Sequence, residues 1–178
     1  MEIYYFTPFA ADKNLGAAYN RYMELIPNDE DWVCFTDADT MFLCPDFGQQ
    51  ILNVVRKYPE AGMFTCYTNR VGNTAQLYGG VMSSVTDIRY HRKLAQQVWL
   101  KNKTNVIRLS KPISGHMMII RKGIWKETKF VNGLLGVDNK ISEALLKKKL
   151  PVYLMKGVYL LHYYRMVEGE KFTKHLKK

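Results

Sequence analysis

The chain has 178 residues, of which 47% are hydrophobic and 24% charged, the size and composition of one globular domain with a sizeable core. Its apolar runs are too short to span a bilayer, and its start lacks the pattern of a signal peptide, so we expect neither membrane insertion nor export. Three cysteines, Cys34, Cys44 and Cys66, lack metal-site spacing and fit buried thiols in a reducing, cytoplasmic compartment.

The formal net charge is +10. Such an excess attracts polyanions, which include nucleic acids, anionic lipid headgroups and nucleotide phosphates. The Lys and Arg residues are spread along the chain, with short clusters at 147–149 and in a basic tail of about 166–178. Because diffuse basicity is more often a solvated surface than a specific site, the charge alone does not identify a partner.

The spacing of apolar residues predicts strands and helices in alternation. Strands are expected at about 3–7, 32–36, 62–67, 106–109, 117–120, 152–155 and 158–162. Helices are expected at about 15–26, capped by Asp12 or Asn14, at 46–58, at 87–101, and from Asp138 to the lysines at 147–149. The initial strand–helix–strand order implies a right-handed crossover and a parallel pair. We therefore expect a single α/β domain, with a mixed, mostly parallel central sheet between helices.

The central predicted strand ends in two carboxylates, Asp37 and Asp39, one residue apart. Ligands bind at the carboxyl ends of strands in open α/β sheets. Two hard oxygen donors at such an edge suit Mg²⁺ or Mn²⁺ and, through the ion, a diphosphate. The alternative is that both acids are turn or cap residues, since Asp favours such positions.

A polar, glycine-containing stretch from 68 to 84 has no clear period and predicts a loop at a site. Further along the chain, Asp138 precedes a predicted helix and His162 ends the last predicted strand. Asp138 could be the N-cap of its helix, although the capping box lacks Glu or Gln at Ile141. His162 could equally be a hydrogen-bonded core histidine.

Three stretches together resemble the GT-A-fold glycosyltransferases, nearest the inverting family 2 enzymes. Residues 35–39 match the family's Asp-x-Asp motif at the end of its central strand. Residues 114–121 and 130–138 resemble its acceptor-side strand and its acidic motif at a helix start. Residues 152–165 resemble the closing strands that return a histidine toward the metal. The resemblance implies one GT-A domain over 1–178 that transfers a sugar from a nucleotide-diphosphate sugar to an acceptor hydroxyl, with inversion.

The resemblance also implies roles for individual residues. Asp39 would bind Mn²⁺ (or Mg²⁺) directly, Asp37 would contact the ribose or the metal through water, and His162 would be the other metal ligand. Asp138 would be the general base. The positions matched to the nucleotide site are Thr7 and Pro8, and Arg165 and Lys13 are candidate diphosphate partners whose alternative is plain surface charge. His116 would face the acceptor or cap Ser114-Gly115, and Tyr163 and Tyr164 would stack on base or sugar or belong to the core.

Two departures from the family pattern stand out. Only one helix separates the first strand from Asp37, so the N-terminal nucleotide-binding half is abridged. The acidic motif commonly has two adjacent acids, whereas here Val137 precedes Asp138.

The expected partners are a UDP- or GDP-sugar donor and an acceptor that is a glycan, a lipid-linked molecule or another hydroxyl compound. The basic charge allows peripheral contact with an anionic membrane, and we expect no specific nucleic acid. A nucleotidyltransferase is one alternative, but the chain lacks a glycine-rich phosphate loop after residues 3–7. A nucleic-acid-binding module is another, and it leaves Asp37, Asp39 and Asp138 unexplained.

Overall fold

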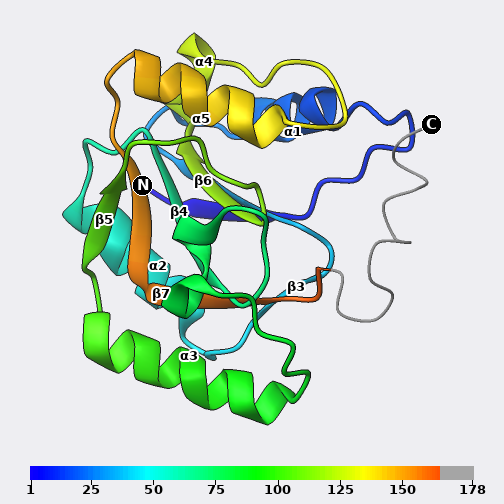
Figure 1. Ribbon diagram of the computed structural model, residues 1–178. Helices are drawn as coiled ribbons and strands as arrows, with labels where there is room; N and C mark the ends of the chain where they lie inside the picture. The colour runs from blue at the N-terminus through cyan, green and yellow to red at the C-terminus, as the bar shows by residue number, and fades with distance from the viewer. Residues whose placement is uncertain (165–178) are drawn as a thin grey trace.

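The computed structural model describes residues 1–164, which form a seven-stranded sheet with helices on both sides (Figure 1). The strands are β1 (Ile3–Phe6), β2 (Trp32–Thr36), β3 (Thr40–Phe42), β4 (Met63–Thr68), β5 (Val106–Leu109), β6 (Met117–Arg121) and β7 (Val152–His162). The helices are α1 (Leu15–Glu24), α2 (Phe47–Lys57), α3 (Ile88–Asn102), α4 (Lys122–Glu127) and α5 (Val137–Lys147), with short 3-10 turns η1 (Thr74–Gln76) and η2 (Tyr78–Gly80). Among these helices, none combines the length and the apolar character needed to cross a bilayer.

The sheet order is β1-β2-β6-β4-β7-β3, and β5 pairs with β7 beside this path. The expected parallel pairing of β1 with β2 is confirmed. The expectation of a mostly parallel sheet is wrong: β4–β7 is the other parallel pair, and the remaining four pairings are antiparallel. β6 runs against both of its neighbours, β2 and β4, and β7 runs against β3 and β5.

Burial on both faces explains why β2 is a continuous apolar run. Val33 and Phe35 pack into the cluster that includes residues of α1, α4 and α5. Trp32 and Cys34 point to the opposite face, into the cluster that includes residues of α2. In Figure 1, α1, α4 and α5 lie together on one side of the molecule and α3 lies on the opposite side, packed against β7. The sheet therefore holds the end of β2 rigidly in the middle of the fold.

The two strands expected at 152–155 and 158–162 are one strand, β7. Its first half pairs with β5 and its last residues pair with β3. The register with β4 shifts between Cys66, opposite Met155, and Tyr67, opposite Tyr159, so that the extra residues of β7 bulge. Because the strand continues past this irregularity, it carries His162 to the edge at which β2 ends.

Helix caps place the predicted helices close to their expected starts. The Asn14 side chain accepts a hydrogen bond from the Ala17 N–H (3.1 Å), which selects Asn14 over Asp12 as the cap of α1. Asp87 caps α3 through the Arg89 N–H (2.8 Å). β3 and α4 were not predicted from the sequence; they are the shortest strand and the shortest α-helix that the structure describes.

Candidate functional site

The ends of β2, β3 and β7 meet at one edge of the sheet. Between β2 and β3 the chain turns tightly, and the Asp37 carbonyl accepts hydrogen bonds from the Thr40 N–H (3.2 Å) and hydroxyl (2.6 Å). Thr40 lies opposite His162 in the antiparallel pairing of β3 with β7. The Tyr163 N–H donates to the Asp39 carbonyl at 2.9 Å. Backbone pairing therefore fixes both carboxylates beside the histidine.

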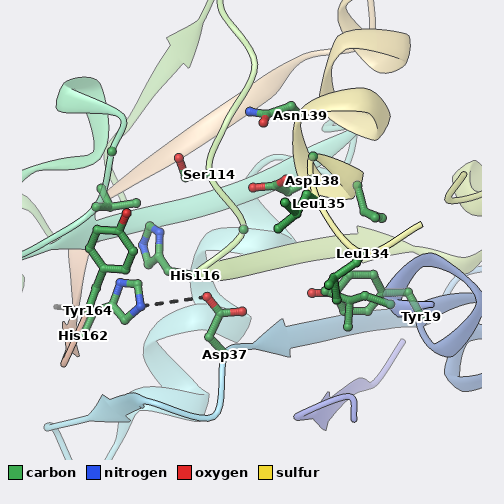
Figure 2. Close-up of a pocket in the computed structure, with 16 residues that line it drawn as sticks. Tyr19, Asp37, Ser114, His116, Leu134, Leu135, Asp138, Asn139, His162 and Tyr164 are labelled. Carbon is green, nitrogen blue, oxygen red and sulfur yellow. Dashed lines mark ion pairs between the residues drawn. The ribbon is translucent and has the colours of Figure 1, made fainter. Parts of the chain in front are cut away.

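Asp37, Asp39 and His162 form a compact group with one potential ligand atom from each residue, all within 4.8 Å of one another. The His162 Nε2 atom lies 3.2 Å from the Asp39 Oδ1 and 3.9 Å from the Asp37 Oδ2. Figure 2 shows the imidazole facing Asp37 across this short gap. The structure thus brings together the three residues assigned to the metal, while their role as ligands stays a prediction.

The orientation of His162 tests whether this group fits a cation. Its Nδ1 atom lies 2.8 Å from the Arg70 carbonyl oxygen, which can only accept, so Nδ1 carries the proton. In the neutral ring, Nε2 then turns its lone pair toward two carboxylates. Lone pair and carboxylates repel one another unless a proton or a metal ion lies between them. A buried histidine whose far nitrogen is fixed by a backbone carbonyl has the arrangement usual for a metal ligand.

The two carboxyl groups have different acidities. Burial raises the pKa of Asp37 to about 6, an effect that Asp39 and Asp138 reinforce and that His162 opposes. Burial also acts to raise the pKa of Asp39, but a protonated His162, through its hydrogen bond and its charge, outweighs burial and holds the pKa below its ordinary value. Asp37 therefore takes up a proton at higher pH than Asp39.

A cleft of about 360 Å³ opens beside this group. Its lining comes from α1, the β2 end, the segment after β4, the start of β6, the start of α5 and the end of β7: Leu15, Tyr19, Asp37, Val71, Gly72, Ser114, Gly115, His116, Leu134, Leu135, Gly136, Val137, Asp138, Asn139, His162 and Tyr164. In Figure 2, Asp37 and Asp138 lie on opposite sides of this space. A substrate in the cleft would lie between the metal candidate and the base candidate.

Asp138 is not the cap of its helix. The N-cap position of α5 is Gly136, in the left-handed conformation (φ 72°), and no side chain caps the helix. Burial raises the pKa of the Asp138 carboxyl, opposed by backbone N–H groups that include that of Gly115. A Cβ atom at Gly115 would lie 2.9 Å from the Asp138 Cβ, so only glycine leaves room for this side chain. Asp138 is held as a partly buried carboxyl of increased basicity.

Two aromatic residues complete the cleft. Tyr19 of α1, which was not predicted as a site residue, lines the cleft, and burial, reinforced by Asp37 and Asp138, raises its phenol pKa. A Tyr at a core position carries a hydroxyl that needs a partner, which is the signal that could have identified it. His116 is buried and stacks on His162 with ring centroids 5.8 Å apart. Burial lowers the pKa of His116 to about 3, so this ring is neutral.

Of the residues assigned to the nucleotide, Asp37 and Tyr164 line the cleft, whereas Thr7 and Pro8 do not. The hydroxyls of Thr7 and Thr36 lie 3.2 Å apart, so Thr7 and Pro8 sit at the end of β1, next to the end of β2 but outside the cleft lining. Arg165 and the basic tail fall outside the described residues. Tyr164 lines the cleft with its ring 5.4 Å from that of His162.

Comparison of the sequence with protein-family models and with curated proteins finds no match.

Proposed function

We propose that this chain is a metal-dependent glycosyltransferase of the GT-A type, resembling the inverting family 2 enzymes. The observation that carries the proposal is the convergence of Asp37, Asp39 and His162 beside a cleft whose far wall holds Asp138. The donor would be a nucleotide-diphosphate sugar, with UDP or GDP as its nucleotide.

Asp37, Asp39 and His162 would hold Mn²⁺ or Mg²⁺. When bound, such an ion neutralises the charge that develops on a leaving diphosphate. Carboxylate oxygens suit both ions, and the imidazole shifts the preference to Mn²⁺. Without a cation, the acids of the cleft would repel a diphosphate. This also argues against nucleic acid as the occupant of the cleft, because a phosphate backbone seeks Lys and Arg.

Asp138 would accept the proton of the attacking acceptor hydroxyl. A base must reach the proton that it removes, and Asp138 projects into the cleft from the side opposite Asp37 (Figure 2). Its raised pKa makes the carboxylate a better proton acceptor than an exposed Asp. A single base serves one direct displacement at the anomeric carbon, which inverts the configuration there.

The decisive experiment is a screen of nucleotide-sugars for Mn²⁺-dependent hydrolysis or transfer, accompanied by thermal melting with UDP and GDP. The proposal expects one nucleotide to stabilise the protein only with Mn²⁺ or Mg²⁺ present, and the matching nucleotide-sugar to be consumed. Stabilisation by a DNA oligonucleotide but by no nucleotide would contradict it. Metal-dependent release of pyrophosphate from a nucleoside triphosphate would indicate a nucleotidyltransferase instead.

A further inference from the structure

We propose that the outer surface of residues 81–101, called here the α3 surface, docks on an anionic lipid bilayer. It comprises the segment from η2 to α3 and the outward side of α3. The inference concerns a surface outside the cleft and does not depend on the proposed transfer reaction. Four observations carry it: exposed apolar side chains, an excess of basic residues, hydrogen bonds that hold the segment to the fold, and a link through Arg70 to His162.

Large apolar side chains are exposed along this segment and on α3. Val81, Met82, Val85, Ile88 and Tyr90 are all exposed within ten residues of sequence, and Leu100 follows on the outward side of α3. Val81 and Leu100 are each 70% exposed. Single exposed apolar residues are ordinary, but a cluster of this kind marks an interaction surface. Burial of these side chains in the headgroup region would remove apolar area from water.

The charge of the same surface is positive. Arg89, Arg92 and Lys93 are exposed on the first turns of α3. From 81 to 101 the sequence has four Lys and Arg residues and one acid, Asp87. Asp87 is engaged as the cap of α3. Basic residues that flank exposed apolar ones are the pattern of interfacial helices on anionic lipids.

The segment that leads into α3 is held in place by the fold. The Ser83 N–H donates to the Asn69 carbonyl (3.0 Å), and the Arg70 guanidinium donates to the Ser83 carbonyl (3.2 Å). His91 lies 2.7 Å from the Val85 carbonyl oxygen through its Nε2 and 2.7 Å from the Tyr159 hydroxyl through its Nδ1. A surface ordered before contact loses little conformational entropy on binding.

The surface is also linked to the cleft. Arg70, which holds the segment, accepts the His162 Nδ1 proton through its own carbonyl. In Figure 1 the N-terminal end of α3 lies toward the same side of the molecule as β3 and the end of β7.

Other occupants fit this surface less well. A nucleic acid would use the basic residues but would leave Val81, Met82 and Ile88 in water. A second copy that pairs the same surface with itself would bring like charges together. The tail at 165–178 has five Lys and Arg and two Glu, so it has the same sign of charge. An anionic bilayer matches both the apolar and the charged residues.

The test is co-sedimentation of the full chain with vesicles of phosphatidylcholine alone and of phosphatidylcholine mixed with phosphatidylglycerol. We expect binding only to the anionic vesicles, weakened by salt. Replacement of Arg89, Arg92 and Lys93 by Gln should lower the partition coefficient by roughly a hundredfold. Each basic residue near an anionic surface raises the affinity by a factor of about five. The double variant V81S/L100S should lower it severalfold.

Matched controls remove the same groups from other faces. The triple variant R21Q/R56Q/K140Q loses equal charge from exposed positions of α1, α2 and α5, and L25S removes a side chain that is 68% exposed. Both should bind the anionic vesicles nearly as well as the natural chain. Absence of vesicle binding, or an equal loss in the controls, would overturn the proposal. So would a dimer that V81S/L100S dissociates, or tight binding of a DNA oligonucleotide that depends on the same three bases but not on Val81.

Discussion

The contact that orients His162 lies on the side of its ring that faces away from the acids. The Arg70 carbonyl fixes the proton on Nδ1, and the Asn69 side chain accepts the His162 backbone N–H at 2.8 Å. His116 stacks on one face of the ring. A histidine held in this way would lose little conformational entropy on binding a metal, and its tautomer already leaves Nε2 free to bind.

Replacement of Asp39 by Asn tests the metal assignment directly. An amide oxygen is a weaker ligand without charge, so D39N should bind Mn²⁺ at least tenfold more weakly, on the scale of lost metal contacts. Because half of the Asp39 side chain is exposed, the fold should stay intact by circular dichroism. Calorimetric titration with Mn²⁺ and UDP measures the effect, with E24Q as the control for loss of one exposed acid. Equal affinities in D39N and the natural chain would remove Asp39 from the site.

A variant at Asp138 distinguishes an effect on catalysis from an effect on donor binding. Replacement of Asp138 by Asn keeps the shape of the side chain but removes the base, so turnover should fall roughly a hundredfold or more. UDP–Mn²⁺ affinity and the melting temperature should stay nearly unchanged, since Gly136 and not Asp138 is the N-cap of α5. Full activity of D138N would exclude Asp138 as the base, and NMR showing retained anomeric configuration would exclude a single displacement.

The strand β7 was predicted from the sequence only in part. Its two apolar runs were predicted, and so was the arrival of His162 near Asp37 and Asp39. Lys156 and Gly157 between the runs have the composition of a turn. The strand continues there because β4 pairs with it on both sides of the bulge, and such long-range pairing leaves no local pattern in the sequence.

The other missed features have similar causes. α4 has six residues, too few to show a helical period, and β3 has three residues whose strand conformation depends on pairing with β7. The two carboxylates were predicted at a sheet edge because they end a buried strand, whereas the approach of His162 to them was implied by the resemblance to GT-A glycosyltransferases. The cleft wall at Leu134 and Leu135 could not be predicted, because it is built by packing between loops that lie far apart in the chain.

Gly157 provides a test of the bulge. A Cβ atom there would collide with the Lys103 backbone carbonyl at the end of α3 and with the Trp99 ring. Backbone cannot yield as a flexible side chain can, so G157A should lower the free energy of unfolding by about 1–3 kcal/mol or more. Urea denaturation measures this change. G72A is the matched control, because a Cβ at Gly72 meets no atom within 4 Å and should leave stability nearly unchanged.

At the scale of the whole molecule, charge is divided along the chain. Residues 1–60 contain ten of the sixteen Asp and Glu residues and only four Lys and Arg. Asp37 and Asp39 belong to this acidic part, and the α3 surface belongs to the basic part. The carboxylates of the cleft therefore favour a cation there, although the net charge of the whole protein is strongly positive.

Without metal, the ionised carboxylate of Asp37 should lower the stability of the protein. The pKa of Asp37 is about 6 in the fold and about 3.9 in an unfolded chain. The folded state therefore holds this proton more tightly, and the contribution of Asp37 to stability declines as pH rises through the window from about 4 to 6. The side chain is 41% exposed, so water screens the effect. Above pH 6, D37N should melt slightly higher than the natural chain when no metal is present.

Bound metal should reverse the order in which D37N and the natural chain melt. Mn²⁺ would join the β2–β3 turn to the end of β7, so its binding should stabilise the whole fold by mass action, by about 2.7 kcal/mol at a concentration of ~100 times the Kd. The ion needs the ionised Asp37, so this gain should shrink as pH falls below about 6. Melting curves with and without Mn²⁺ at several pH values measure it. The natural chain should then melt above D37N near pH 7.5, whereas D37N should gain little from Mn²⁺ at any pH. An equal gain in both proteins, independent of pH, would place the ion elsewhere.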